Sequence, residues 1–304
     1  MGSNRGLLEA VPNFSEGRSA TTVDALVAAA GSVLLDRHAD ADHHRSVLTL
    51  AGTTAELRRA APRLFEAARR HIDLRGHRGE HPRVGALDVF PVIPLAGATM
   101  DEAAQLARDL GRELAQSGVP VFLYGAAHPG RRPLPAIRRG GRRGLARRLA
   151  RGRLRPDYGP PALHPTMGAA CFGAREILIA FNVNLVGDTS RVAWSIAHAI
   201  RSQGGGLPAL RAIGVSRSGG TQVSMNLLDW RRTSLKRAYA AVRRRAEAAG
   251  AGVLDSEIVG LIPEAAGWSG MEHDLRLEAP VRTIEGALAG RPGEPSGSEV
   301  RKVE

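Results

Sequence analysis

Strand and helix signals alternate along the whole chain, and this order restricts the fold more than any other feature of the sequence. In the first half, short apolar runs alternate with segments whose apolar residues recur at helical spacing. The expected strands there are 7–11, 33–36, 46–50, 86–95 and 119–124, and the expected helices are 22–30, 54–72 and 100–117. Thr99, with Glu102 three residues later, forms a capping box that marks the start of the third helix.

The second half repeats this pattern. Its expected strands are 177–185, 210–215, 221–227 and 252–262, and its helices begin after Asp188 and at Thr233. Each half therefore has roughly the order β-α-β-β-α-β, which predicts an α/β protein of the α+β type with two mixed sheets, each covered by helices on one face. Two open sheet faces predict a cleft between them, which is the default place for a ligand.

Composition narrows the class of protein. With 43% apolar and 24% charged residues, the chain resembles globular proteins rather than disordered or fibrous ones. Its single cysteine, Cys171, excludes an internal disulfide and a cysteine-based zinc site. The start MGSNRG has no apolar signal segment, and no run reaches the roughly 18 apolar residues of a membrane helix. We therefore expect a cytoplasmic protein that does not enter a membrane.

The net charge of +12 is concentrated in one segment. Residues 131–155 contain 11 arginines and no acidic residue, which leaves +1 for the rest of the chain. We interpret this segment as a solvated connector; an anion-attracting rim beside a site and an RNA-binding patch are the alternatives. Because the segment has no aromatic residue on which bases could stack, nucleic acid is the weakest of the three.

Six of the ten histidines lie between His38 and His81. Adjacent His43 and His44 cannot both point to one face of a strand, which disfavours a metal site. We interpret the following as solvated loop residues: His38, His71, His77 and His128. His81 differs, because it stands between Glu80 and Arg83 in a turn before a buried strand. Imidazole takes and gives a proton near neutral pH, so His81 is either a catalytic acid/base or the structural histidine of a capped turn.

Polar residues interrupt two of the predicted strands. Asp88 lies within the apolar strand 86–95, where a buried carboxylate costs several kcal/mol unless it is paired. Strand 221–227 alternates strictly, with Val223, Met225 and Leu227 on one face and Gln222, Ser224 and Asn226 on the other. The uncharged polar face suits the wall of a hydrogen-bonding cleft. An ordinary polar sheet face is the equal alternative.

Seven strings, taken in order, resemble the glutamate formiminotransferase family. They are VPNFSEGR (11–18), DHHRSV (42–47), RGHRGEHPRVGALDV (75–89), PDYGP (156–160), GAREILIAFNVNL (173–185), QVSMNLLD (222–229) and SEIVGLIP (256–263). In that family two α/β subdomains hold folate in a cleft. A formimidoyl group passes there from N-formimino-L-glutamate to N5 of tetrahydrofolate, in histidine degradation and one-carbon metabolism.

This resemblance implies a division of the chain and a set of site residues. It places an N-subdomain at 1–187 and a C-subdomain at 188–288; the remainder, 289–304, is Gly/Pro/Ser-rich and charged, which predicts disorder. The family's catalytic acid/base corresponds to His81, and its folate-binding segment to 173–182. That segment comprises Gly173, Ala174, Arg175, Glu176, Ile177, Leu178, Ile179, Ala180, Phe181 and Asn182.

The implied reaction also needs groups that bind carboxylates. Arg45, Arg83 and Arg175 are candidates, since guanidinium binds carboxylate in a bidentate manner. Further candidates for substrate contacts are Asp88, Gln222 and Asn226. We expect tetrahydrofolate as co-substrate, formiminoglutamate as donor, no metal, no membrane or nucleic-acid partner, and a homodimer.

Some positions depart from the family pattern. His44 stands where relatives commonly have asparagine, and GGRRGL at 140–145 stands where they often have the acidic GEFEGL. The chain also ends before the cyclodeaminase domain of some animal relatives. Formyl transfer from N-formylglutamate or another donor is the nearest alternative function. A non-catalytic folate- or RNA-binding protein is the alternative from another class.

Overall fold

The computed structural model describes residues 6–78, 82–187, 189–217 and 220–291. Its larger sheet has seven strands: β1 (Leu8–Ala10), β2 (Asn13–Phe14), β3 (Leu34–Asp40), β4 (Arg45–Gly52), β5 (Leu87–Pro94), β6 (Val121–Gly125) and β7 (Ala170–Ala174). β1 and β2 each pair with both β4 and β5, so they share one position between these strands. β3 pairs antiparallel with β4, and β1 and β2 pair antiparallel with β4 and β5. Because β5, β7 and β6 run parallel, this sheet is mixed, as predicted.

Three helices pack on one face of the larger sheet: α1 (Ala20–Ala30), α2 (Thr54–His71) and α3 (Met100–Ala115). The capping box that begins α3 is confirmed, and Thr53 with Glu56 forms a second one at the start of α2. Leu8 and Ala10 of β1 point into the core under these helices. Side chains alternate along a strand, so Glu9 points to the opposite, uncovered face.

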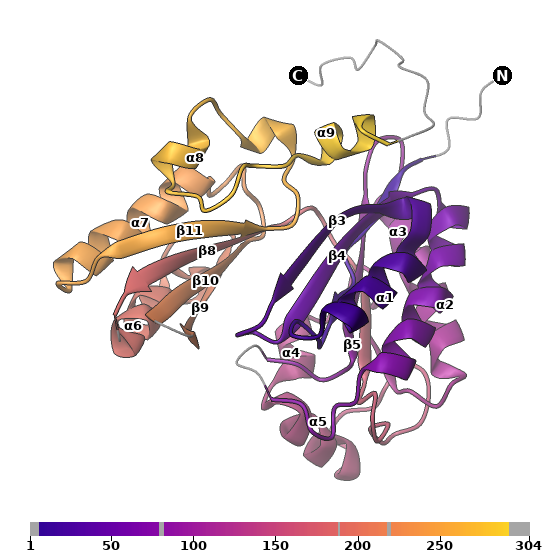
Figure 1. Cartoon of the computed structure of the whole chain (residues 1–304). Coiled ribbons are helices and arrows are strands. Elements are labelled where there is room, and N and C mark those ends of the chain that lie inside the picture. The colour runs from indigo at the N-terminus through magenta and orange to yellow at the C-terminus, as the bar shows by residue number, and fades with distance from the viewer. Residues whose placement is uncertain (1–5, 79–81, 188, 218–219, 292–304) are drawn as a thin grey trace.

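The smaller sheet consists of β8 (Ile179–Val186), β9 (Leu210–Arg217), β10 (Gly220–Leu227) and β11 (Val253–Val259). Its helices are α6 (Ser190–Ile200) and α7 (Leu235–Ala248), which confirms the order β-α-β-β-α-β for this part of the chain. The strand order is β11-β8-β10-β9. Every described pairing in this sheet is antiparallel, so the expectation of a second mixed sheet was wrong. Figure 1 shows the two sheets beside one another, with α2 and α3 on the far side of the larger one.

Helix starts in the smaller unit differ slightly from expectation. α7 begins after Ser234, whose hydroxyl accepts the backbone N–H of Arg237, while the Thr233 hydroxyl donates to the Pro208 carbonyl at 2.6 Å. α6 begins after Thr189, and Asp188 lies outside the described residues. The alternation along β10 is confirmed, because Val223, Met225 and Leu227 all lie in the core.

The change from one sheet to the other comes earlier than the sequence suggests. β8 pairs with β10 and β11, so it belongs to the smaller sheet, whereas a boundary after residue 187 assigns it to the first unit. The crossover therefore lies between Ala174 and Ile179. The larger unit is also more elaborate than β-α-β-β-α-β, because β2 and β7 carry too few residues for a clear sequence signal.

The arginine-rich segment is not a solvated connector, and that interpretation was wrong. It forms α4 (Leu134–Arg138) and α5 (Gly141–Ala150), which bury Ile137, Leu145 and Leu149. Three of its arginines bond to the rest of the protein: Arg132 to Asp157, Arg138 to Asp88, and Arg142 to the carbonyls of Leu74 and Pro165. A fourth, Arg148, bonds to four carbonyls of its own segment. Other arginines of the segment are exposed: Arg131, Arg139, Arg143, Arg147, Arg151, Arg153 and Arg155.

The last described residues return to the larger sheet. α9 (Ile284–Ala289) packs against β3. It follows the short helix α8 (Met271–Asp274), and the chain also has three short 3₁₀ turns, at Gly31–Val33, Ser202–Gly204 and Glu264–Ala266. Arg282 pairs with Asp36, and Arg291 donates to the carbonyls of Val33 and Ala51. The predicted tail thus begins later than 289, and residues 292–304 lie outside the described part. In the described ranges no helix is long and apolar enough to cross a membrane.

Candidate active site

A cleft of about 650 Å³ lies between the uncovered faces of the two sheets. The larger sheet contributes residues of β1, β3, β4 and β5, and the smaller sheet contributes residues of β8, β9, β10 and β11. Residues 174–178, which connect the sheets, and Arg131 to Arg138 complete the lining. The predicted cleft between two open sheet faces is therefore present.

One end of the cleft, which we call the Asp88 end, is lined by Asn13, Arg45 and Arg138; Asp88 is buried against these arginines and does not line the cleft itself. Asp88 is fully buried and lies 3.1 Å from Arg45 Nη1; Arg138 bonds to the same carboxylate oxygen, and the Val84 N–H donates to the other at 2.8 Å. Burial alone raises the pKa of Asp88, but Arg138 and Arg45 outweigh it and hold that pKa below its ordinary value. The sequence-based expectation that Asp88 must be paired is confirmed.

The Asp88 end brings two arginine side chains to one carboxylate. Arg45 also donates from Nε to the Asn13 side-chain oxygen at 2.9 Å, which fixes its guanidinium in the wall. Burial and the neighbouring Arg138 lower the pKa of Arg45 to about 10, so it remains charged at neutral pH. The guanidinium groups of Arg45 and Arg138 thus both bond to the one Asp88 carboxylate. A ligand carboxylate is the natural partner of such a pair.

The other end, which we call the Glu9 end, is formed by Glu9, Tyr124 and Arg175. All three line the cleft, and Glu9 is only 4% exposed. Burial raises the pKa of Glu9 to about 7, although Arg175 opposes that shift. Burial also lowers the pKa of Arg175 and raises that of Tyr124 to about 12. Perturbed acids in a cleft are typical of functional sites.

The part of the smaller sheet's wall that β10 contributes is polar and uncharged, whereas β9 adds Arg211. Ser224 and Asn226 of β10 line it, as the cleft-wall interpretation predicts. Gln222 does not, because it is buried behind the wall, where its amide nitrogen donates to Asn184 at 2.9 Å and to Glu257 at 3.2 Å. Because its amide nitrogen already bonds to side chains of the protein and the residue does not line the cleft, Gln222 is poorly placed to contact a substrate.

The segment 173–182 contributes to the cleft with alternate residues, because part of it is strand. Those that line the cleft are Ala174, Arg175, Glu176, Leu178, Ala180 and Asn182. Ile177, Ile179 and Phe181 pack into apolar clusters instead, and Gly173 lies against the ring of Tyr124. About half of the segment can therefore contact a ligand directly.

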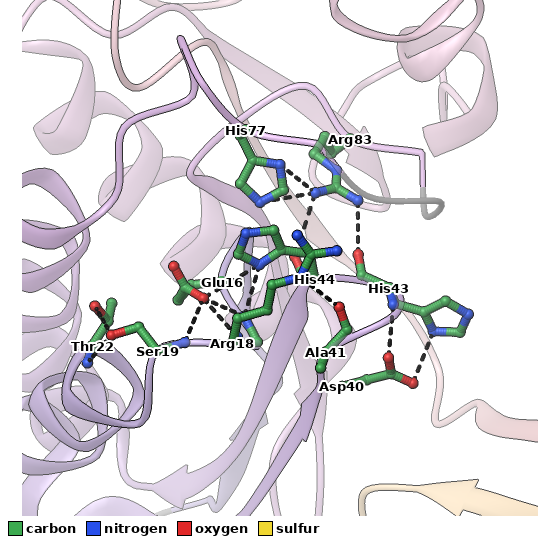
Figure 2. Close-up of polar contacts among 11 residues, drawn as sticks. Glu16, Arg18, Ser19, Thr22, Asp40, Ala41, His43, His44, His77 and Arg83 are labelled. Carbon is green, nitrogen blue, oxygen red and sulfur yellow. Dashed lines mark hydrogen bonds and ion pairs between the residues drawn. The ribbon is translucent and has the colours of Figure 1, made fainter. Parts of the chain in front are cut away.

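A second polar cluster lies beside the cleft (Figure 2). The Glu16 carboxylate accepts three consecutive backbone N–H groups at 2.7–2.9 Å and lies 3.3 Å from His44 Nδ1. The His44 and His77 rings stack with centroids 4.0 Å apart, and Arg83 Nη1 lies 2.6 Å from His77 Nδ1. Burial, with Arg83 and His44 nearby, lowers the pKa of His77 to about 4. His77 is thus a packed neutral residue, not a solvated loop histidine.

Two further histidines, His38 and His43, line the cleft. His43 is buried, lines the cleft and lies 3.4 Å from Asp40, whereas its neighbour His44 turns toward Glu16. His38 on β3 also lines the cleft, 4.0 Å from Glu257 of the smaller sheet, so its interpretation as a solvated loop residue was wrong. In the part of the chain that the structure describes, no group of three or more His, Cys, Asp or Glu could hold a metal.

Two predicted site residues need separate mention. His81 lies outside the described residues, so its catalytic role stays a prediction. Arg83 does not line the cleft; it donates to the carbonyls of His43 at 2.8 Å and His44 at 3.4 Å, which ties the turn before β4 in place. Of the three arginines proposed for carboxylates, Arg45 and Arg175 face the cleft.

Sequence reasoning missed Glu9 and Arg138. Glu9 carries the same signal as Asp88, a single acid in an apolar strand, but the strand is too short for the signal to stand out. Arg138 was hidden among many arginines, and only Ile137 beside it marks the point where the segment turns inward. A search for acids within apolar runs could have found Glu9.

Comparison with known proteins covers nearly the whole described chain. The model of the formiminotransferase domain, N-terminal subdomain, matches residues 7–175, and that of the formiminotransferase domain matches residues 180–278. The two matches meet where the chain passes from the larger to the smaller sheet.

Similar proteins carry related names. A glutamate formimidoyltransferase of Streptococcus pyogenes serotype M1 is 39% identical over 90% of this chain and 94% of its own length. One of Thermoplasma acidophilum is 40% identical over 86% of this chain and 89% of its own. The formimidoyltransferase-cyclodeaminase of Sus scrofa is 41% identical over 84% of this chain, which corresponds to 50% of that longer protein.

Proposed function

This chain belongs to the formiminotransferase family, and we propose that its cleft transfers a formimidoyl group from N-formimino-L-glutamate to N5 of tetrahydrofolate. The observation that carries this proposal is the coverage of both sheets, and of the cleft between them, by the two family matches. The products are 5-formiminotetrahydrofolate and glutamate. The enzyme is a one-carbon group transferase with tetrahydrofolate as co-substrate.

The chemistry requires one bond to form and one to break. N5 of tetrahydrofolate attacks the amidine carbon of the donor and gives a tetrahedral intermediate. The bond from that carbon to the glutamate nitrogen then breaks, and the proton lost from N5 is balanced by the proton gained by the leaving amine. Holding both substrates face to face in one cleft supplies much of the rate, because it makes the reaction effectively intramolecular.

The Asp88 end suits the donor. Formiminoglutamate carries two carboxylates, and the guanidinium groups of Arg45 and Arg138, which line the cleft, can bind one of them. Asn13 holds the Arg45 fork in place, so little side-chain freedom is lost when the donor binds. Asp88 thus acts by positioning the two arginines.

His81 is the proposed carrier of the transferred proton. A histidine takes a proton from one nitrogen and returns it to another near neutral pH, a role typically worth about 10²- to 10⁴-fold in rate. His77 and Arg83, which bond to one another, flank His81 in sequence. Its assignment rests on the resemblance of the GEHPR motif.

His44, which stands where relatives commonly have asparagine, is compatible with the same reaction. His44 has φ 48°, a left-handed conformation in which asparagine and histidine are both enriched. Its side chain faces Glu16 and His77 and does not line the cleft. We therefore assign this departure to the geometry of the turn and not to donor specificity.

A turnover assay with two donors tests the function. Purified protein is offered tetrahydrofolate with either formiminoglutamate or N-formylglutamate, and the folate product is identified by its absorbance and mass. Formimidoyl transfer at a much higher rate than formyl transfer supports the proposal. Preference for formylglutamate favours the nearest alternative, and folate binding without either transfer favours a non-catalytic protein. A cytoplasmic location and a homodimer stay predictions.

A further inference from the structure

The Glu9 end differs from the Asp88 end, because no described residue forms an ion pair with the Glu9 carboxylate. Glu9 pairs across the sheet with Ile93, whereas Asn13 of the Asp88 end pairs with Val89. Four residues of strand separate the two ends by about 13 Å. A ligand at the Glu9 end is therefore distinct from a carboxylate held by Arg45.

Glu9 is more than nine-tenths buried and points into the cleft. No residue in the described ranges forms a hydrogen bond with its carboxylate or pairs with it within 4 Å. A buried carboxylate without such partners is costly, and a native protein keeps one where a ligand supplies the missing donors. The Arg175 charge acts on Glu9 from nearby without closing an ion pair.

Arg175 is the complementary group at this end. Its side chain donates from Nη1 to the Glu176 carbonyl at 2.9 Å and is hydrogen-bonded to Tyr124, and the guanidinium lines the cleft together with Glu9. Glu9 and Tyr124 are the groups that offset its charge there. The end thus offers an acceptor and a donor side by side, with a net charge of zero.

We propose that Glu9 and Arg175 recognise the 2-amino-4-oxopyrimidine edge of the tetrahydropterin ring. This edge presents two N–H donors, on the 2-amino group and N3, beside one acceptor, the 4-oxygen. The Glu9 carboxylate accepts the two N–H groups as a fork, and Arg175 donates to the oxygen. The inference rests on the proposed function, since it takes tetrahydrofolate as the occupant.

Charge decides between the two substrates at this end. The donor is a dianion, and Glu9, with Glu285 of α9 close enough to act on it, repels a second carboxylate here. A pterin ring is neutral and needs paired donors and acceptors, which matches the balance of Glu9 and Arg175. The apolar lining nearby, including Pro91, Leu178 and Leu261, suits the faces of a flat ring.

Equilibrium binding tests this subsite without any turnover. The affinity of the protein for tetrahydrofolate is compared with that for its 2-desamino-2-methyl analogue, which lacks one of the two N–H donors. We expect the wild type to prefer tetrahydrofolate by about 10- to 100-fold, as for a hydrogen bond to a charged group. In Glu9→Gln the preference falls about tenfold, and in Glu9→Met it disappears.

Glu285→Gln is the matched control, because it removes an equal charge near Glu9 from a residue that does not line the cleft. It should keep the wild-type preference, and circular dichroism should show that all variants fold. Equal affinity of the wild type for both ligands overturns the inference, as does an unchanged preference in Glu9→Met or a wild type that binds neither ligand. Retained preference without formimidoyl transfer contradicts the proposed function alone.

Discussion

The two ends of the cleft handle buried charge in opposite ways. At the Asp88 end the carboxylate is paired with two arginines and accepts a backbone N–H. At the Glu9 end a carboxylate and a guanidinium face the same space without closing an ion pair. The comparison teaches that a paired acid organises its neighbours, whereas an acid without such partners is available to a ligand. Accordingly, the pKa of Asp88 is below its ordinary value, whereas burial raises the pKa of Glu9 to about 7.

His81→Ala tests whether chemistry is separate from both binding ends. We expect kcat to fall by at least about 100-fold while the affinity for tetrahydrofolate changes little, because a general acid/base acts on the barrier. Steady-state rates and ligand titration of the same preparation measure both. Turnover close to that of the wild type removes His81 from the mechanism.

Asp88→Asn tests the paired end. The change leaves Arg45 and Arg138 buried without their counter-charge, and the free energy of unfolding should fall by about 3–5 kcal/mol in urea denaturation. Asp109→Asn is the control, because it breaks a surface ion pair with Arg58 and should cost at most about 1 kcal/mol. Equal losses in the two variants contradict the organising role of Asp88.

Glu9→Gln tests the Glu9 end through the pH dependence of stability. The folded protein holds the Glu9 proton up to about pH 7, whereas the unfolded chain releases it near pH 4.5, so folding loses stability as the pH rises between these values. The variant lacks this loss and should be more stable than the wild type at pH 8, by at most about 3 kcal/mol. At pH 4 the two should be alike. Parallel stability curves from pH 4 to pH 8 contradict the burial of an ionisable Glu9.

Most helices and strands, and the paired carboxylate of the Asp88 end, could be predicted from the sequence. Helices with capping boxes and strands with strict alternation appear where expected, because local signals determine them. Asp88 stood out in a long apolar strand, but its partner Arg138 comes from a segment fifty residues away, and no local pattern reports such a contact. The arginine segment was misjudged for a related reason: composition reports charge, and only the fold separates arginines that point inward from those that point outward.

The outward arginines give the smallest expected effect. Changing Arg139, Arg143, Arg147 and Arg151 to Gln should alter the free energy of unfolding by less than about 1 kcal/mol, since like charges four residues apart repel slightly. The matched change of Arg142 and Arg148, which bond to carbonyls, should cost more, at about 1–3 kcal/mol. Thermal melting compares the two sets, and a larger loss from the outward set contradicts the division.

The division of the cleft into a donor end and a pterin end is tested most directly by the KM values of two variants for both substrates. Arg138→Gln should raise the KM for formiminoglutamate by about 10- to 100-fold and leave that for tetrahydrofolate within about threefold. Glu9→Gln should raise the KM for tetrahydrofolate by about 10- to 100-fold and leave that for formiminoglutamate within about threefold. If each variant raises both KM values alike, the two ends do not bind different substrates, and the account is wrong.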